Sequence, residues 1–310
     1  MKLIAVIPAF NEESNIKRVI AETKRYVNDI IVIDDGSSDR TSAISSEAGA
    51  VVVNHPQNMG VGSAFATGVG RALEMGADIV VTLDADGQFQ STDIPKVIEP
   101  IIEGRADLVT GSRFLDRDMT PEMIGSKRFG NRLFTWIVSQ LTGQEFTDTQ
   151  CGFRAYSKEA LLRLTIFGRF TYTQEVLLDL IDKNMRVVEV PVKVLPRQSG
   201  ESKVVRNPVN YGIRALKIII QAERDHHPLR FFGAISLLFI ISAALMFTIV
   251  TAHWLTTGMT SPFTSLLSIG GTLLLVGVIF IILALVADMQ GRSRRLQEEI
   301  LYLLKRQRYS

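Results

Sequence analysis

The first 110 residues alternate short apolar runs with stretches whose apolar residues recur at helical spacing. The apolar runs lie at residues 3–7, 29–33, 51–53, from 79 onward and at 108–110. Continuous runs of this length are typical of strands that are buried on both faces of a parallel sheet. The stretches between them predict helices, the first with a stripe formed by Ile16, Val19, Ile20 and Thr23. Alternating strand and helix units predict an α/β fold with an open, doubly wound, mostly parallel sheet.

Regular alternation fades in the middle of the chain. The apolar stretch at residues 132–141 is suited equally to packing against the domain and against a bilayer, and both placements remain open. Residues 173–184 predict a helix that carries Glu175, and residues 187–194 predict a strand. Residues 207–224 show an amphipathic helical pattern that suits the surface of a membrane.

Two longer apolar segments, residues 231–252 and 266–287, carry no formal charge. Each is about 22 residues long, which is enough to span a bilayer. The connection between them holds no Lys or Arg, whereas both outer flanks are rich in these residues, so the positive-inside bias predicts that both ends are cytoplasmic. We therefore expect a multi-pass protein of the cell membrane with two spans. The expected domains are a cytoplasmic α/β domain over 1–205, a juxtamembrane amphipathic helix over 206–229, two transmembrane helices within 230–288 and a cytoplasmic C-terminal helix over 289–310.

Composition narrows the classes of partner. Lys and Arg number 34 against 32 Asp and Glu, and this near balance does not indicate binding to nucleic acid. The single cysteine, Cys151, excludes an internal disulfide and is expected to be a small core residue in a reducing compartment. The N-terminal MKLIAVIPAF leads at once into polar residues without a small-residue cleavage site, so we expect a first strand there rather than a cleaved signal.

Charged side chains follow several of the predicted strands. Asp34 and Asp35 end the second apolar run, Asp84 and Asp86 follow the fourth, and Arg113 follows the fifth. Side chains at i and i+2 of an extended segment point the same way, so Asp84 and Asp86 are expected on one side. Two close carboxylates repel unless a cation lies between them, and Mg²⁺ or Mn²⁺, completed by substrate phosphates, suits such oxygen ligands. The pattern predicts a metal and phosphate site beyond the carboxyl ends of the strands, although solvated turn and cap residues would give the same spacing.

A series of motifs occurs in order along the first two thirds of the chain. They are VIPAFNEE, VIDDGSSD, NMGVGSAFATGVGRA, LDADGQ, GSR, TQCGFRAYSKEAL, and EVPV followed by RQSGESK. The ordered set, over roughly residues 2–203, resembles the inverting glycosyltransferases of family 2, and among them the dolichyl-phosphate mannose synthase branch. The resemblance implies the GT-A fold of nucleotide-diphospho-sugar transferases.

The resemblance also implies roles for individual residues. Asp84, Asp86 and Gln88 would coordinate the metal on the donor diphosphate, with Asp84 also reaching the nucleotide. Arg113 would contact phosphate of the donor, and Arg128 the phosphate of the acceptor. The implied catalytic group is Asp86, Arg113, Arg128 and Glu175. The implied nucleotide-sugar contacts are Pro8, Phe10, Glu12, Ile33, Asp35, Asp84, Ala85, Asp86, Gln88, Arg113, Val188, Arg197 and Lys203.

Two positions depart from the pattern of the family. Phe10 stands where many relatives have tyrosine, so a hydroxyl contact to the base or ribose would be missing. Gln174 and Glu175 stand in place of the usual Glu-Asp pair, which leaves the use of a protein base open. A lipid phosphate, judged from phosphoamino acids with a second pKa of about 6, is mostly dianionic near neutral pH and could attack without a base.

These observations together predict a metal-dependent, inverting hexosyltransferase. The donor would be GDP- or UDP-linked mannose or glucose, the acceptor a polyprenyl (dolichyl) phosphate, and the place of reaction the cytoplasmic face of the bilayer. Self-association into a homo-oligomer remains open. One alternative is a membrane polysaccharide synthase, which the absent Gln-x-x-Arg-Trp signature and the small number of spans disfavour. Another is a non-catalytic, membrane-tethered scaffold that binds nucleotide-sugar, which the complete set of charged residues disfavours.

Overall fold

The computed structural model describes residues 1–116, 125–165, 172–195, 220, 224 and 228–309, with the side chains of 125–127 and 129 excepted. The chain forms two compact units. The first consists of Met1–Gly212 together with Ile300–Ser310, and the second of Ile213–Glu299.

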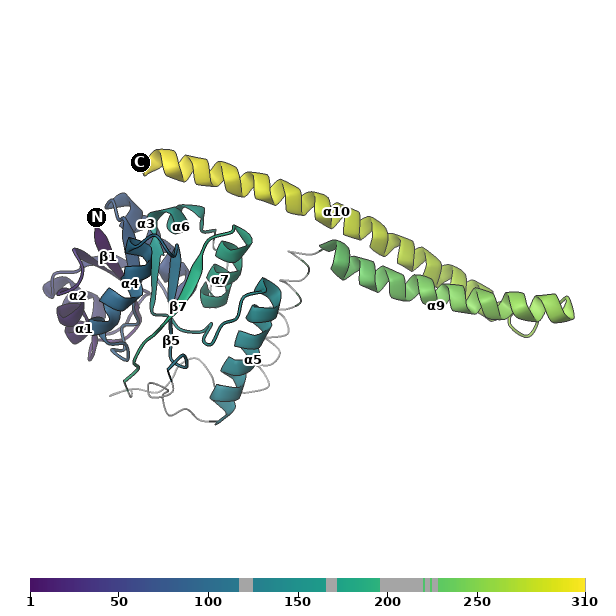
Figure 1. Cartoon of the computed structure of the whole chain (residues 1–310), viewed down its shortest axis with the longest axis horizontal. Coiled ribbons are helices and arrows are strands. Elements are labelled where there is room, and N and C mark those ends of the chain that lie inside the picture. The colour runs from purple at the N-terminus through teal and green to yellow at the C-terminus, as the bar shows by residue number, and fades with distance from the viewer. Residues whose placement is uncertain (117–124, 166–171, 196–219, 221–223, 225–227, 310) are drawn as a thin grey trace. The chain divides into compact units, whose positions relative to one another are not determined.

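A seven-stranded sheet forms the centre of the first unit, with the spatial order β3-β2-β1-β4-β6-β5-β7. Its strands are β1 (Leu3–Ala9), β2 (Asp29–Asp34), β3 (Val51–Asn54), β4 (Ile79–Thr82), β5 (Leu108–Ser112), β6 (Arg154–Ser157) and β7 (Val187–Pro191). Every neighbouring pair is parallel except for the two pairs that contain β6, which runs antiparallel to both β4 and β5. The predicted α/β fold with a mostly parallel sheet is therefore confirmed (Figure 1).

Helices cover both faces of this sheet. They are α1 (Ile16–Thr23), α2 (Thr41–Glu47), α3 (Val61–Glu74), α4 (Ile94–Ile102), which a 3-10 turn (Ser91–Asp93) precedes, α5 (Gly125–Thr142), α6 (Lys158–Arg163) and α7 (Tyr172–Asp182). Residues of α3, α6 and α7 join one hydrophobic cluster, and residues of α1 and α4 join a second. The buried residues of α1 are those of the predicted stripe, Ile16, Val19, Ile20 and Thr23.

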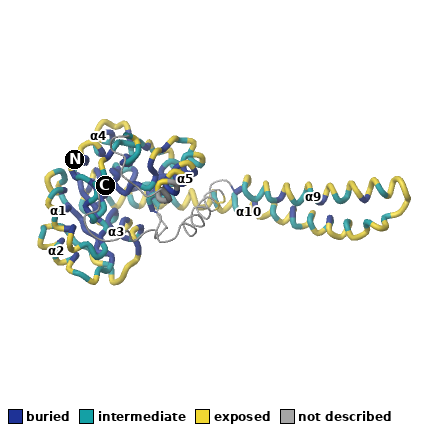
Figure 2. Tube along the Cα trace, turned by 90° about the horizontal axis from the view of Figure 1, so that it is seen from below, coloured by how far each residue is buried: buried dark blue, intermediate teal, exposed yellow. Residues whose placement is uncertain are grey.

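Strand β1 separates the two clusters. Ile4 and Val6 belong to the cluster that contains α3, whereas Leu3, Ala5 and Ile7 belong to the opposite one. Successive side chains of a strand point to opposite faces, so a continuous apolar run suits a sheet that is covered on both sides. Figure 2 shows the resulting band of buried residues through the first unit.

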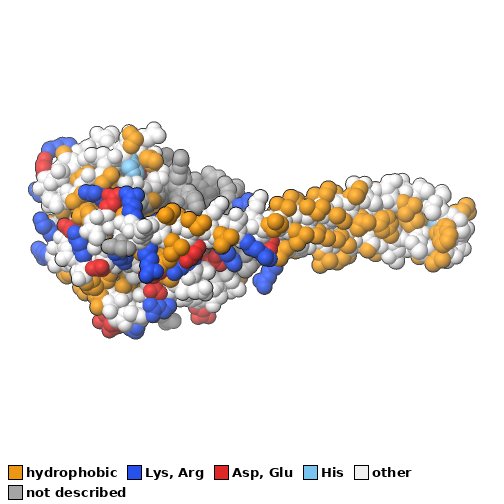
Figure 3. Space-filling model, turned by 90° about the horizontal axis from the view of Figure 1, so that it is seen from above, with side chains coloured by type: hydrophobic (Ala, Val, Ile, Leu, Met, Phe, Trp, Pro, Cys, Tyr) orange, Lys and Arg blue, Asp and Glu red, His pale blue; other side chains and the backbone are white. Residues whose placement is uncertain are grey.

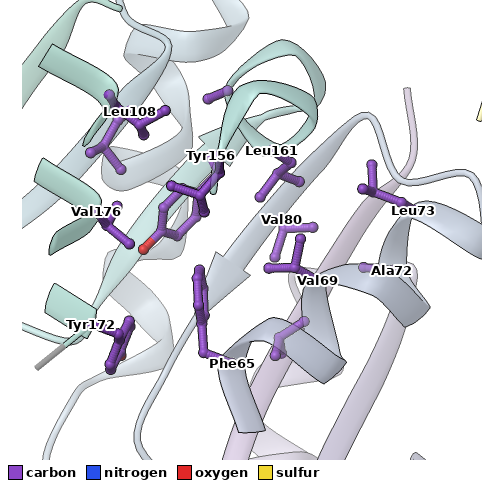
Figure 4. Packing of buried hydrophobic residues seen from close by; sticks show 14 of the residues in the cluster. Phe65, Val69, Ala72, Leu73, Val80, Leu108, Tyr156, Leu161, Tyr172 and Val176 are labelled. Carbon is purple, nitrogen blue, oxygen red and sulfur yellow. The ribbon is translucent and has the colours of Figure 1, made fainter. Parts of the chain in front are cut away.

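An aromatic group joins three elements of the α3 cluster. The ring centroid of Phe65 lies 5.4 Å from that of Tyr156 and 4.8 Å from that of Tyr172 (Figure 4). These rings come from α3, β6 and α7, so their packing holds the first turn of α7 against the sheet. That turn carries Glu175.

The antiparallel strand β6 was not predicted from the sequence. It begins with Arg154, whose side chain is fully buried. The guanidinium donates hydrogen bonds to the backbone carbonyls of Cys151 at 3.0 Å, Thr173 at 2.6 Å and Thr149 at 3.0 Å. An arginine is polar, so a search for apolar periodicity does not identify a short strand that begins with a buried arginine.

Helix α5 answers the question left open for residues 132–141. Phe134, Ile137 and Val138 are buried in the first unit, so one face of the segment packs against the domain. Trp136 on the same helix is 61% exposed, so another face presents a large amphipathic side chain. The segment thus packs on the domain and still offers an apolar surface.

The second unit holds two long apolar helices, α9 (Pro228–Thr257) and the greater part of α10 (Thr264–Arg308). Among the described residues, these two are long and apolar enough to cross a membrane. They pack through Ser236, whose Oγ donates to the carbonyl of Gly277 at 2.8 Å, and through stacked rings of Phe239 and Phe280. Small residues and interhelical hydrogen bonds of this kind are typical of membrane helix pairs. Figure 3 shows hydrophobic side chains over much of the visible surface of this hairpin.

The predicted domain boundaries are only partly visible. Helix α10 continues without a break to Arg308, so the C-terminal helix expected over 289–310 is the end of the second apolar helix rather than a separate element. The juxtamembrane helix expected over 206–229 lies almost wholly outside the described residues.

The last residues of α10 belong to the first unit. Tyr302 is 7% exposed and joins the hydrophobic cluster of α3, α6 and α7. The guanidinium carbon of Arg163 lies 4.2 Å from the centre of the Tyr302 ring, within range of a cation–π interaction. Lys305 Nζ donates to the carbonyl of Leu164 at 2.8 Å. The chain therefore leaves the first unit before the apolar hairpin and returns to it afterwards.

Replacing Tyr302 by Ala should destabilise the first unit by about 3 kcal/mol, because a buried ring and its cation–π partner are lost. Leu303→Ala is the matched control, since Leu303 lies on the same helix and is 53% exposed. The chain has two tryptophans, so Trp254→Phe leaves Trp136 to report unfolding of the first unit by fluorescence. Equal unfolding midpoints for the two alanine variants would contradict this docking of the C-terminal segment.

Candidate functional site

Charged residues meet at the carboxyl edge of the sheet. Strand β1 lies between β2 and β4, so the acids after β2 and those after β4 flank its end. Strand β6 is antiparallel to both β4 and β5, which makes β4 and β5 parallel to each other. Arg113, directly after β5, therefore lies at the same edge as Asp84 and Asp86. Ligands of open α/β sheets bind in this region.

The segment from Asp84 to Gln88 forms a turn rather than the extended backbone expected from the sequence. Strand β4 ends at Thr82, and Ala85 and Asp86 lie in the turn that follows. Ala85 is buried, whereas Asp84 and Asp86 are partly exposed. Asp86 Oδ1 accepts a hydrogen bond from the backbone N–H of Gln88 at 3.0 Å, which closes the turn. The exposure of the two acids thus comes from turn geometry and not from strand alternation.

Asp84 lies against the backbone of Gly152. A Cβ atom at position 152 would stand 3.0 Å from Asp84 Oδ1, so a larger residue there would push the carboxylate by a few tenths of an ångström. Thr82 Oγ1 donates to the carbonyl of Gly152 at 2.8 Å and fixes this approach. Burial, and next to it the charge of Asp84, raise the pKa of Tyr172 well above its usual value. Tyr172 therefore remains a neutral phenol beside the acidic site.

Gln88 connects the turn to the segment after β7. Its Nε2 donates to the carbonyl of Leu195 at 3.3 Å, and the N–H of Leu195 donates to the carbonyl of Gln88 at 2.8 Å. The amide oxygen of Gln88, the atom that a hard cation would bind, is thereby turned away from Leu195. Arg197 and Lys203 follow Leu195 in the sequence but lie outside the described residues.

The residues after β4 fit a divalent ion of the Mg²⁺ or Mn²⁺ type. Asp84 and Asp86 provide carboxylates and Gln88 an amide oxygen, which are hard oxygen donors. The described part of the chain holds no group of three or more His, Cys, Asp or Glu side chains placed to bind a metal. An ion at this turn would therefore have few protein ligands and would complete its shell with water and phosphate, as Mg²⁺ commonly does.

Arg113 is held by Asp148 in a bidentate pair. Its Nε and Nη2 donate to the two carboxylate oxygens of Asp148 at 2.6 and 2.9 Å. Burial by itself would lower the pKa of Arg113, but the hydrogen bonds and the charge of Asp148 outweigh burial and raise it. The pair uses two of the five N–H donors of the guanidinium, so its plane is fixed while further donors remain for a ligand.

Asp148 is itself fixed by a second carboxylate. Glu189 accepts the N–H groups of Thr147 at 2.8 Å and of Asp148 at 2.9 Å. Burial raises the pKa of Glu189, and these N–H donors only partly offset it. The guanidinium of Arg113 is thus oriented through Asp148 and Glu189, a series of contacts that connects the end of β5 to β7.

The sequence alone did not single out Asp148, Gly152 or Arg154, although the last two lie within a quoted motif. Asp148 is 35 residues from Arg113, and the approach of Asp84 to Gly152 depends on the unpredicted strand β6. The one sequence feature that could have indicated this close approach is Gly152, which follows Cys151 in that motif.

Asp35 is engaged by the loop that follows β3. Its two oxygens accept the N–H groups of Met59 and Gly60, each at 2.9 Å, and the ring nitrogen Nδ1 of His55 lies 2.7 Å from Oδ1. The neighbouring Asp34 accepts instead from Ser37 in a local turn. Of the two acids that end β2, Asp35 is therefore the one that positions the glycine-bearing loop.

The remaining predicted residues divide into two groups. Pro8, Phe10 and Glu12 are partly exposed at and after the end of β1, Glu175 is partly exposed in the first turn of α7, and Arg128 is exposed on α5. Ile33 is fully buried in the core, and Val188 lies in the middle of β7, the edge strand next to β5. Contacts of these two residues with a nucleotide-sugar stay predictions.

Cys151 is a buried core residue, as expected. Burial, assisted by the charge of Asp148, raises its pKa to about 12. A thiol with this pKa is protonated near neutral pH and is not a nucleophile.

Residues 4–165 match glycosyl transferase family 2. A UDP-N-acetylglucosamine–dolichyl-phosphate N-acetylglucosaminyltransferase of Methanococcus voltae is 37% identical over 211 residues, which are 61% of this chain and 84% of the relative. Glycosyltransferase AglJ of Haloferax volcanii is 28% identical over 286 residues, 91% of both chains, so this similarity extends through the apolar hairpin.

The fold has a counterpart among solved structures. Glucosyl-3-phosphoglycerate synthase from Mycobacterium tuberculosis, solved with Mn²⁺, UDP-glucose and phosphoglyceric acid, superposes with a TM-score of 0.55 at 23% identity, over 72% of this chain and 78% of that one. At this identity the likeness establishes the fold alone. The sequence match to the family spans more than half of the 310 residues and includes strands β1 to β6, and the chain therefore belongs to glycosyl transferase family 2.

Proposed function

We propose that this enzyme transfers a hexose from a nucleotide-diphosphate sugar to a polyprenyl phosphate at the cytoplasmic face of the membrane, with inversion and with a divalent metal. The observation that carries the proposal is the presence, in one chain, of acids and a fixed arginine at the carboxyl edge of the sheet and of an apolar hairpin. The first suits a water-soluble diphosphate donor, and the second suits an acceptor that stays in a bilayer. The M. voltae relative, named for a dolichyl-phosphate acceptor, supports the same acceptor class.

The donor diphosphate would bind at the turn after β4. Asp84, Asp86 and Gln88 would hold Mg²⁺ or Mn²⁺, which offsets the charge that develops on a departing diphosphate. Arg113, oriented by Asp148, would add charge-assisted hydrogen bonds to the same phosphate oxygens. The M. tuberculosis enzyme, which shares the fold, was solved with Mn²⁺ and UDP-glucose, so the fold can accommodate this class of ion and donor. We assign Arg197 and Lys203 to the donor phosphates by resemblance.

The acceptor phosphate would attack the anomeric carbon while the bond to the diphosphate breaks. Because a lipid phosphate is largely dianionic near neutral pH, this in-line displacement needs no protein base, and Glu175 need not fill that role. Arg128 on α5 is our candidate for contact with the acceptor phosphate. The exposed indole of Trp136 on the same helix suits the head-group region of a bilayer, which supports an approach of this face to the membrane.

The path of the chain supports a two-span topology. The first unit contains residues before and after the hairpin, which supports a topology with both ends of the hairpin on the same side of the membrane. The Lys and Arg residues that flank the two apolar helices favour the cytoplasmic side.

Product identification tests the proposal. Membranes containing the full chain, polyprenyl phosphate and labelled UDP- or GDP-linked mannose, glucose or N-acetylglucosamine should yield one labelled lipid with a single sugar per phosphate. N-acetylglucosamine belongs in the panel because the M. voltae relative is named for it. A polymeric product would favour a polysaccharide synthase, and nucleotide-sugar binding without any turnover would favour a scaffold.

Replacing Asp86 by Asn should reduce transfer by about 10²-fold or more, because the carboxylate that holds the ion is lost at unchanged size. Glu47→Gln is the matched control, an acid-to-amide change at an exposed position on α2. Initial rates of both variants, measured with increasing Mn²⁺, would test this difference. A chelator should abolish wild-type transfer. Full wild-type activity in chelator would refute the role of the metal.

Replacing Arg113 by Lys should reduce transfer by about 10²-fold, because lysine keeps the charge but cannot form the bidentate pair that orients it. The surface provides a control with the same geometry, since Arg186 donates to both oxygens of Asp107 at 3.0 and 3.1 Å and is mostly exposed. Arg186→Lys should leave the rate unchanged. An equal effect of both substitutions on the rate would remove Arg113 from the site.

A further inference from the structure

His55 has no role in the donor and acceptor sites described above, yet its side chain is largely buried and hydrogen-bonded at both ring nitrogens. Its Nδ1 lies 2.7 Å from Asp35 Oδ1, and its Nε2 lies 3.0 Å from Thr67 Oγ1 on α3. The side chains of His55 and Asp35 are 8% and 6% exposed. The ring therefore connects the end of β2 to α3 through a nearly dry contact.

The hydrogen-bond partners fix which ring nitrogen carries a hydrogen. Asp35 already accepts two backbone N–H groups, so it faces His55 as an acceptor, and Nδ1 must be the donor. The hydroxyl of Thr67 can donate or accept, so Nε2 is satisfied whether or not it is protonated. The imidazole of His55 thus donates to Asp35 through Nδ1.

The loop that contains His55 is pressed against the turn after β2. The N–H of His55 donates to the carbonyl of Asp34 at 2.8 Å. Gly36 adopts a φ of +76°, and a Cβ there would lie 2.5 Å from the backbone carbon of Gln57. A close backbone approach of this kind, together with the side-chain contacts, makes the turn and the loop one fixed structure around Asp35.

Counting acceptor positions shows what Asp35 can still bind. A carboxylate offers about four acceptor positions on its two oxygens. Oδ1 receives His55 Nδ1 and the N–H of Met59, and Oδ2 receives the N–H of Gly60. One position, on Oδ2, receives no donor from the residues that the structure describes. Asp35 is therefore suited to one N–H donor and not to a pair of adjacent donors, which would need both oxygens.

We propose that His55 is a positioning and specificity-determining residue for the nucleobase of the donor. It holds Asp35 so that a single acceptor position faces the ligand, which fits a base with one ring N–H, such as uracil. Guanine presents a ring N–H next to an amino group, and this pair would leave one donor without a partner. A buried donor left unpaired lowers affinity. The inference rests on the proposed function, since it requires that the nucleotide reaches Asp35.

Titration calorimetry of the full chain in detergent, with Mn²⁺ and either UDP or GDP, tests this assignment. Wild type should bind UDP about tenfold or more tightly than GDP. His55→Ala should weaken UDP binding about tenfold and reduce the preference for UDP over GDP, because Asp35 loses the hydrogen bond from His55 Nδ1. His55→Asn should restore most of the affinity, since the asparagine amide can donate from near the position of Nδ1. Gln57→Ala, an exposed position in the same loop, is the control and should bind as wild type.

Steady-state kinetics separate positioning from a general loss of structure. His55→Ala should raise the KM for the UDP-sugar while kcat stays within about threefold, because the diphosphate and the reacting carbon are bound elsewhere. Equal affinity of wild type for UDP and GDP, or equal losses in the Ala and Asn variants, would overturn the assignment. Failure of wild type to bind either nucleotide would instead contradict the proposed function itself.

Discussion

The hydroxyl of Thr82 donates to the backbone carbonyl of Gly152 at 2.8 Å, and this hydrogen bond ties the end of β4 to the residues that lead into β6. Strand β6 can lie there because the buried guanidinium of Arg154 donates to three backbone carbonyls, one of them at the start of α7. Such charge-assisted hydrogen bonds compensate the desolvation of the cation. The same strand spaces β4 from β5, and so sets where Arg113 stands relative to the acids. Loss of this packing would separate Arg113 from the acids that follow β4.

The site is built from pairs in which one side chain orients another. Asp148 fixes the plane of Arg113, Glu189 fixes the backbone of Asp148, and Leu195 fixes the amide of Gln88. Preorganised groups of this kind stabilise developing charge without having to reorganise during the reaction. On the proposed function, the strongly charged donor would be held on the rigid sheet, and the acceptor would be left to the apolar hairpin.

Much of the fold could be predicted from the sequence because its strands are continuous apolar runs. The stripe of α1 and strands β1 to β5 and β7 all follow from periodicity. Strand β6 could not be predicted, because its buried face is built on Arg154 and no apolar pattern marks it. The turn at Ala85 and Asp86 was also missed, since a strand that leads into acids gives no sign of where the backbone bends.

The acids after β2 and β4 could be assigned to one edge of the sheet from the sequence, because parallel strands bring their carboxyl ends together. The residues that orient them could not. Asp148, Gly152 and His55 act on partners that are distant in the chain, so only the folded structure reveals them.

The position of the bound ion tests the central claim most directly. A structure of the full chain with Mn²⁺ and a nucleoside diphosphate, with the manganese located by its anomalous scattering, would measure it. We predict an ion about 2 Å from a carboxylate oxygen of Asp84 or Asp86, in contact with the diphosphate and within reach of the Gln88 amide oxygen. A diphosphate bound without manganese, or a manganese peak remote from both aspartates, would contradict this account.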